Sequence, residues 1–248
     1  MTDKWRPYLC RVNGNLASIF VDLGLRSEVP ITSKPWLLWV WVYFQQPRAD
    51  GLSSSEEAPT LFKIEDALNV EISQRCHGIP CGRITTEGRR EFYYYGETNL
   101  GLNEAVVAAL ANFVGYRFDK GEQQDSRWEQ YQNVLYPSEE DLERIANQDV
   151  LAKLEEQGDV PTVPREVVHW LYFRSEASRF LFREAAVKVG FRIVSESLTS
   201  EDRGFGISIA RTQTVDRAQI DKTVVDLLHL AQRFDGDYDG WESPVVTQ

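Results

Sequence analysis

Apolar residues in the second half of the chain recur at two different spacings, which predict a series of strands and helices. Residues 167–173 are apolar at almost every position, as in a strand buried in a sheet. Residues 176–189 and 216–234 carry apolar side chains three and four positions apart, which is the spacing of one helix face. The expected inward residues of the first helix are Ala177, Phe180, Leu181 and Ala185. Further strands are expected at 191–197, 205–209 and 238–246.

The first half repeats this order of elements after an additional hairpin. An Asn-Gly turn at 13–14 joins two expected strands, 8–12 and 17–23. The apolar run 36–44 predicts a central strand, and we interpret its three tryptophans as core rather than as an exposed binding face. The elements expected next are a helix at 56–74 with Leu61, Ile64, Leu68 and Ile72 inward, a hairpin at 82–95, a helix at 103–114 and a strand at 116–120.

Both halves therefore follow the order strand, helix, strand, strand, helix, strand, which is that of a ferredoxin-like sandwich. We predict an α+β fold of two ferredoxin-like α/β sandwich halves with antiparallel sheets and a helical acidic connector. The expected parts are an N-terminal α+β domain at 1–121, the connector at 122–164 and a C-terminal domain at 165–248. The second face of each sheet then needs a cover, either from the other half or from another protein.

The connector is rich in acidic residues and contains one expected helix. Ser138 precedes three acids, which favours a helix start because its side-chain oxygen and the negative charges satisfy the first free amides. Gly158 and the prolines after it end that helix. We interpret this charge run as a solvated helix face, and the alternative is that Glu139, Glu140 and Glu143 form a candidate docking face for a basic partner.

A stretch near the C-terminus combines aspartates, glycines and two large aromatic residues. Residues 235–240 match the opening of an EF-hand calcium loop, D-x-D-x-D-G, but the twelfth position, which needs Glu, is Val246. We therefore prefer a structural interpretation, in which Gly236 ends the last helix as its C′ residue and an edge strand follows. In this structural interpretation, the side chain of Trp241 packs into the hydrophobic core and anchors the strand. The candidate motif residues are Asp237, Tyr238, Asp239, Gly240, Trp241 and Glu242.

The chain of 248 residues has a net charge of −11 and a pI of about 4.9. This acidity argues against direct binding of nucleic acid, because a phosphate backbone is recognised by clustered Lys and Arg. No stretch approaches the roughly 20 apolar residues of a membrane span, so we expect no membrane partner and a cytoplasmic location. The three cysteines, Cys10, Cys76 and Cys81, do not describe a disulfide framework. The Cys76-His77 and Cys81 group lacks the second pair of ligands that a structural zinc needs.

Residues with catalytic potential are few. His169 lies in a strand that we expect to be buried and His229 in a leucine-rich helix, so both are predicted to be structural, although His169 stays among the candidate interaction residues. The crowded carboxylates of 235–242 could form an acid–base pair, because neighbouring carboxylates raise each other's pKa, but a solvated turn is preferred. We predict no catalytic residue, no metal and no cofactor, and we lean against an enzyme.

These motifs and their order resemble two known families. The features of the second half are 165–173, the helix that ends at Gly190-Phe191, and the tail 236–242; those of the first half are 50–52, 82–84 and 90–95. Residues 165–246 resemble the regulator of ribonuclease activity B (RraB) family, and the first half is similar to a bacterial family known as domain of unknown function 695. The RraB resemblance implies a ferredoxin-like fold and a role in protein binding. The named member of that family binds and inhibits the endoribonuclease that initiates messenger RNA decay.

Two functional hypotheses follow. The first is a non-enzymatic, protein-binding regulator that docks on a basic partner, with a ribonuclease as the candidate. The alternative is an uncharacterised enzyme or small-ligand binder that uses a cleft between the two halves. An exposed aromatic sheet face or an acidic surface favours the first hypothesis, and an apolar pocket with converging polar groups favours the second. The sequence leaves the oligomeric state open.

Overall fold

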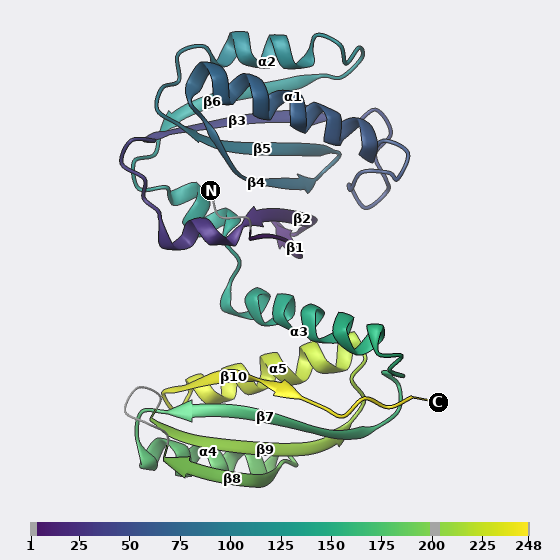
Figure 1. Cartoon of the computed structure of the whole chain (residues 1–248), viewed down its shortest axis with the longest axis vertical. Helices are drawn as coiled ribbons and strands as arrows, with labels where there is room; N and C mark the ends of the chain where they lie inside the picture. Colours follow the sequence, from purple (N-terminus) through teal and green to yellow (C-terminus); the bar gives the residue numbers. More distant parts are fainter. Residues whose placement is uncertain (1–3, 199–203, 248) are drawn as a thin grey trace. The chain divides into compact units, whose positions relative to one another are not determined.

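Two antiparallel sheets, one of six strands and one of four, organise the chain (Figure 1). The computed structural model describes residues 4–198 and 204–247. By its contacts the chain divides between Ser138 and Glu139 into two units, and each unit has one of the sheets. The predicted α+β fold of two sandwich halves is confirmed.

The first unit contains a ferredoxin-like sheet that is extended at one edge by a hairpin. Its strands are β1 (Trp5–Val12), β2 (Asn15–Asp22), β3 (Trp36–Tyr43), β4 (Ile79–Thr86), β5 (Arg89–Gly96) and β6 (Phe118–Gln124). Its helices are the 3₁₀ turn η1 (Leu23–Ser27), α1 (Ala58–Cys76), α2 (Leu102–Leu110) and the π-helical turn η2 (Tyr131–Leu135). The strand order is β1-β2-β4-β5-β3-β6, and its last four strands have the ferredoxin-like order with every pair antiparallel.

The core of the first unit lies between α1, α2 and one face of the sheet. Leu38, Val40 and Val42 alternate along β3 toward the helices. The predicted inward positions of α1 are confirmed, since all four are fully buried: Leu61, Ile64, Leu68 and Ile72. Of the three tryptophans of β3, only Trp36 packs against this core.

Trp39 and Trp41 lie on the outer face of the first sheet, by which we mean its face opposite α1 and α2. Both side chains are half-buried, with ring centroids 4.7 Å apart, and the Arg89 guanidinium lies 4.6 Å above the Trp41 ring. Residues 36–44 were expected to form a strand buried on both faces. On the outer face, however, Trp39 and Trp41 are only half-buried, and a charged side chain, Arg89, covers part of Trp41. Alternation along β3 places these two rings together, since they are two positions apart.

Another part of the outer face is covered by the chain's own segment 125–136. Trp128, Tyr131 and Leu135 of this segment are all fully buried. The Trp128 ring stacks on the Tyr95 ring at 3.8 Å with an interplanar angle of 6°. Leu135 is anchored because its carbonyl oxygen accepts a hydrogen bond from the Tyr8 hydroxyl, at 3.0 Å. The first unit thus supplies a second hydrophobic layer to its own sheet.

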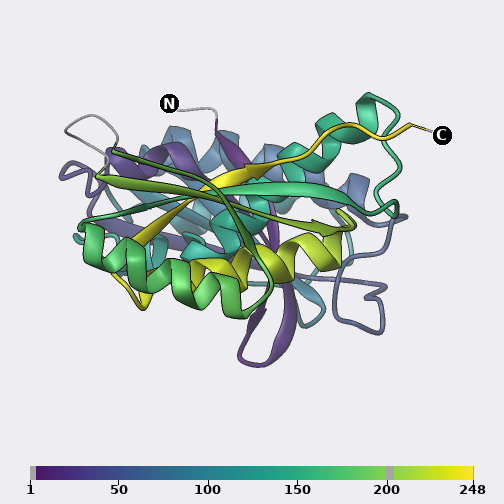
Figure 2. The ribbon, with the colours of Figure 1, turned by 90° about the horizontal axis from the view of Figure 1, so that it is seen from below.

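The second unit is a ferredoxin-like sandwich preceded by one more helix. Its elements are α3 (Glu139–Glu156), β7 (Arg165–Phe173), α4 (Glu176–Lys188), β8 (Arg192–Leu198), β9 (Phe205–Gln213), α5 (Arg217–Gln232) and β10 (Gly236–Glu242). The sheet order β10-β7-β9-β8 is the ferredoxin-like order, again with all pairs antiparallel. Helices α4 and α5 lie along the same face of this sheet (Figure 2).

The segment expected as a connector, 122–164, is shared between the two units. Residues up to Ser138 belong with the first unit, where β6 continues to Gln124 and 125–136 covers the sheet. Helix α3 belongs with the second unit and packs against α5. Its inward residues include Ile145 and Leu154, both of which are buried. An acidic helix with few apolar positions is therefore part of a folded unit.

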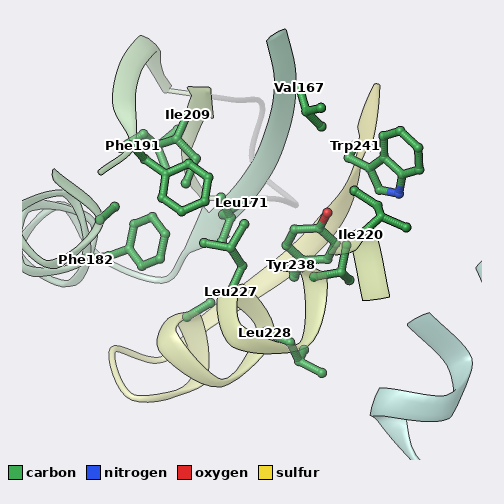
Figure 3. Close-up of a cluster of buried hydrophobic side chains, with 14 of the residues drawn as sticks. Val167, Leu171, Phe182, Phe191, Ile209, Ile220, Leu227, Leu228, Tyr238 and Trp241 are labelled. Atoms are coloured by element: carbon green, nitrogen blue, oxygen red, sulfur yellow. The ribbon is translucent and has the colours of Figure 1, made fainter. Parts of the chain in front are cut away.

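The core of the second unit lies between α4, α5 and the inner face of the sheet (Figure 3). The predicted inward face of α4 was wrong by about one residue. Phe180 and Leu181 were expected inside but are each 53% exposed. Phe182 is fully buried instead and packs against Phe173, with ring centroids 4.8 Å apart. The sequence Phe-Leu-Phe at 180–182 fits two helix faces. The face with Arg179 is the inward one, because its guanidinium donates to the carbonyl oxygens of Ser197 and Gly206 at the sheet end.

Candidate functional site

Strand β10 brings two aromatic residues of the C-terminal motif into the core. Tyr238 and Trp241 are each 8% exposed, and both reach the buried cluster (Figure 3). They are three positions apart, so a regular strand would place them on opposite faces. The pairing with β7 shifts register between Tyr238 and Gly240, so that Asp239 is an extra residue and the strand bulges. Gly240 has a φ of 126°, which favours glycine, and this explains the Asp-Gly pair between the aromatic residues.

Trp241 also joins three elements through hydrogen bonds. Its indole Nε1 donates to Asn147 Oδ1 of α3 at 2.8 Å. Asn147 Nδ2 in turn donates to Asp221 Oδ1 of α5, also at 2.8 Å. Asn147 is 1% exposed, so the chain of bonds is shielded from water. This finding supports the predicted anchor role of Trp241, and it shows a role for Asn147 that its sequence context did not indicate.

The last helix was expected to end with Gly236 as its C′ residue, but the left-handed residue after the helix is Asp235, one position earlier. Helix α5 ends at Gln232, and Asp235 adopts the left-handed conformation with a φ of 52°. Gly236 is already the first residue of β10, opposite Phe173. A Cβ at Gly236 would lie 2.1 Å from the Phe173 ring, so this glycine is required by packing instead of by a helix cap.

His169 lies in the middle of the core, where β7 faces the helices. Its Nδ1 is 2.9 Å from the Tyr238 hydroxyl, and its ring meets Phe191 edge to face. The side chain is fully buried; burial, with the positive charge of Arg211, lowers the pKa of His169 to about 3. The imidazole is therefore neutral at physiological pH. The same burial raises the pKa of Tyr238 well above its usual value, so the pair is a neutral hydrogen-bonded contact.

The three candidate glutamates of α3 lie beside α5 and β10. Glu140 bonds Arg144 at 2.9 Å and lies 3.0 Å from His229 Nε2, and Glu139 accepts a hydrogen bond from Gln232 Nε2 at 2.6 Å. A hollow of about 290 Å³ is lined by Glu139, Leu142, Glu143, Leu228, Gln232, Gly236, Asp237 and Tyr238. Burial, and then repulsion by Asp239 and Glu139, raises the pKa of Glu143 to about 7. Glu139 and Glu140 therefore form contacts within the second unit, and Glu143 is partly buried there.

Asp237 and Glu242 of β10 lie on the opposite face of the strand from its aromatic residues, whereas the bulge residue Asp239 is close enough to Glu143 of α3 to raise its pKa. Asp237, Asp239 and Glu242 are exposed. In the pairing with β7, Asp237 is opposite Tyr172, Gly240 opposite Trp170, and Glu242 opposite Val168. Directly paired residues share a face of a sheet, so Asp237 lies beside Tyr172 and Glu242 beside Val168, on the face that also carries Trp170.

We call the face of the second sheet opposite α4 and α5 its outer face; Figure 1 views the unit from this side. Its central side chains are Val168, Trp170 and Tyr172 of β7, all half-buried, and beside them lie the small residues Gly206, Ser208 and Ala210 of β9. The sequence predicted a second sheet face that needs a cover but not which side chains form it, because 167–173 is apolar at nearly every position. The signal was available in the choice of residues, since Trp and Tyr alternate with the smaller inward Leu171.

Within 4–198 and 204–247, no group of three or more His, Cys, Asp or Glu residues is arranged to hold a metal ion. The same residues include no helix that is long and apolar enough to cross a bilayer. The three histidines lie apart along the chain: His77 ends α1, His169 is in β7, and His229 is in α5. The candidate site that we consider is the outer face of the second sheet with the exposed acidic residues of β10 at its edge.

The fold and this surface define a two-unit α+β protein built from ferredoxin-like sandwiches. The chain belongs to the DUF695 family, a family of unknown function whose model matches residues 3–136. The model of the family "regulator of ribonuclease activity B" (RraB) matches residues 144–243, which confirms the resemblance in the second half. No curated protein matches the chain. Among solved structures, an unknown protein from Galdieria sulphuraria is similar at 13% identity, with 86% of this chain and 99% of that chain covered and a TM-score of 0.23.

Proposed function

We propose that this protein is a non-enzymatic regulator that acts by binding another protein, and that a ribonuclease is the candidate partner. The observation that carries the proposal is the match of residues 144–243 to the RraB family. These residues coincide with most of the second structural unit, including α3 from Arg144 onward and the bulged β10 with its two aromatic anchors. A match over most of a folding unit supports a shared fold, and the role in protein binding is the part that we propose.

The charge of the chain supports a protein partner over RNA. At a net charge of −11 an exposed acidic edge repels phosphates, so an effect on RNA would pass through a basic protein surface. A cytoplasmic location fits this role, because no disulfide joins Cys10, Cys76 and Cys81, which is usual in a reducing compartment.

The docking charges that we favour are those of β10. Glu139 and Glu140 were candidates, but each also bonds a residue of α5, so reversing their charge would disturb folding as well as docking. Asp237 and Glu242 are exposed on the outer side of an edge strand, where a change of charge alters the surface with little effect on the core.

The test is binding of the purified full chain to a candidate ribonuclease, and separately to single-stranded RNA, at two salt concentrations. We expect binding to the ribonuclease that weakens as salt rises, because exposed charges are screened within about 10 Å at 0.1 M. We also expect a changed rate of RNA cleavage. Tight RNA binding without any protein partner, or turnover of a small molecule by the chain, would contradict the proposal.

A further inference from the structure

We propose that the outer face of the second sheet is the docking site for an arginine-rich segment of the partner protein, with a guanidinium stacked on Trp170. The inference rests on the proposed function, since it assumes that the partner is a protein. It adds the location of the contact, the class of side chain that is recognised, and the residues that recognise it.

The shape of the surface suits a flat cation. Gly206 lies so close to Tyr172 that a Cβ there would be 3.2 Å from the ring, so the glycine lets the ring lie along the sheet. Gly240 is paired with Trp170, and the position of a Cβ at Gly240 has nothing within 4 Å. The indole of Trp170 therefore has open space on its β10 side. Toward β9 its neighbour is the small residue Ser208, whose hydroxyl bonds Ser195.

The charges around Trp170 select a basic ligand. Glu166 and Arg192 form an ion pair with each other at 2.5 Å, and Asp237 and Glu242 of β10 add two exposed negative charges. Asp237 and Glu242 lie on the neighbouring strand, about 4.8 Å from β7 in a sheet of ordinary spacing. A guanidinium can stack on an aromatic ring and bond a carboxylate at the same time, which an ammonium does less well. A phosphate would be repelled.

The first unit shows the same contact made within the chain. There the Arg89 guanidinium lies 4.6 Å above Trp41, and Glu91 holds it at 2.6 Å. Trp41 is on β3, the first strand of its ferredoxin-like repeat, as Trp170 is on β7 of the second. Among the described residues no guanidinium lies over Trp170. A partner's arginine would occupy the place that Arg89 fills in the first sheet.

The test uses three labelled probes: a 12-residue peptide of alternating arginine and glycine or serine, the same peptide with lysine for arginine, and a 12-nucleotide single-stranded RNA. Each is titrated by fluorescence anisotropy against the full chain. The test variants are Trp170→Ala and the pair Asp237→Asn with Glu242→Gln. The matched controls are Phe180→Ala and Glu184→Gln, which change an exposed aromatic residue and an exposed acid on α4.

We expect the arginine peptide to bind more tightly than the lysine peptide, and Trp170→Ala to weaken it about ten-fold, as for loss of a stacked cation. The double carboxamide variant should weaken binding and reduce its salt dependence, while both controls stay within about two-fold. Equal loss in the controls, no loss in Trp170→Ala, or tighter binding of the RNA at this face would overturn the proposal. Thermal melting checks that each variant is folded. If Trp170→Ala is unfolded, peptide binding is instead compared in the double carboxamide variant and in Trp170→Phe, which keeps an aromatic ring.

The candidate ribonuclease is titrated against the same variants. If it binds wild type and Trp170→Ala equally, the docking site is wrong and the proposed function stands. If the peptide results hold but wild type does not bind the ribonuclease, the docking surface stands and the proposed partner is wrong.

Discussion

The two sheets share one topology and differ in how their outer faces are finished. The first sheet is covered in part by the chain itself, through segment 125–136 with Trp128 stacked on Tyr95, and through Arg89 over Trp41. In the second unit, α4 and α5 lie on the inner face and α3 packs against α5, so the described elements leave Trp170 half-buried on the other side. Within residues 4–198 and 204–247, the same strand order thus yields a sheet with hydrophobic layers on both faces and a sheet with one on its inner face.

The comparison separates the structural from the interactive aromatic residues. An aromatic residue covered by its own unit contributes to folding, whereas one on a face without a cover is available to a partner. By this criterion Trp128 and Tyr131 stabilise the first unit, Trp241 stabilises the second, and Trp170 is the aromatic residue that we propose for binding. The most distinctive sequence motif of the second unit, at 236–242, therefore contributes its aromatic residues to stability and its carboxylates to the surface.

The largest expected effect is a loss of folding stability when an aromatic residue is removed from the covered outer face of the first sheet, compared with the same change on the second sheet. Trp128→Ala should destabilise the first unit by about 3–5 kcal/mol, because it removes a fully buried ring from the stack on Tyr95. The matched control is Trp170→Ala, which should cost less than about 1 kcal/mol, in the range of surface substitutions. Urea unfolding followed by circular dichroism measures both. Similar losses for the two variants would contradict the distinction between the faces.

A smaller effect is expected from Trp241→Phe, which keeps an aromatic ring in the core but removes the indole donor. Asn147 Oδ1 then loses its partner in a shielded site, and we expect a loss of about 1–3 kcal/mol for an unsatisfied buried acceptor. Asn147→Ala tests the same bond from the other side and should give a non-additive double mutant. Additive losses would show that the bond does not couple α3 to β10.

The pH dependence of stability should change in Glu143→Gln. Because the pKa of Glu143 is raised from 4.5 to about 7, its protonated form contributes stability that is full below about pH 4.5 and is lost as pH rises through 7. For this part-exposed carboxyl we expect about 1–2 kcal/mol after solvent screening. Asp239 and Glu139 face the group and stay in place in the variant.

His169 acts in the opposite direction, so the variant must be compared with wild type at each pH. With its pKa lowered to about 3, neutral His169 contributes stability that is present above pH 6.5 and is lost as pH falls toward 3. Melting midpoints between pH 4.5 and 8 give the difference that belongs to Glu143. A constant difference across this range would show that the carboxyl does not titrate there.

The smallest expected effect is that of calcium. Residues 235–240 match the start of an EF-hand loop, but Asp235 ends a helix turn and Gly236 already pairs with β7, so the aspartates do not form one loop around an ion. Millimolar Ca²⁺ should leave the melting midpoint unchanged, with Mg²⁺ at the same concentration as the control. A saturable upward shift with calcium alone would restore the metal hypothesis.

Much of the fold could be predicted because strand and helix spacings are local signals. The inward residues of α1 and the ferredoxin-like order of both units followed from them. The helix phase of α4 did not, because three consecutive apolar residues fit two faces and the decision depends on Arg179, whose partners are carbonyl groups far along the chain. The place of α3 depends in the same way on Asn147, a polar residue that a hydrophobic pattern ignores.

The candidate site was only partly predictable. The inward position of Trp241 could be expected from its size, but the bulge that places Tyr238 beside it on the same face depends on pairing with β7. The outer position of Trp170 could not be predicted, because nearly every residue of 167–173 is apolar and polar residues do not mark the outer face. Which of two apolar faces receives a cover is decided by elements elsewhere, such as segment 125–136 in the first unit, and that information is not local.

The bulge in β10 also bears on the solubility of the protein. Strand β10 is an edge of its sheet, and a straight edge offers free amides and carbonyls to the strand of another molecule. The extra residue Asp239 interrupts that ladder, and the acids on either side of it would bring like charges together if two copies approached edge to edge. A motif with the appearance of a metal loop thereby makes this edge of the sheet a poor template for pairing with a second copy.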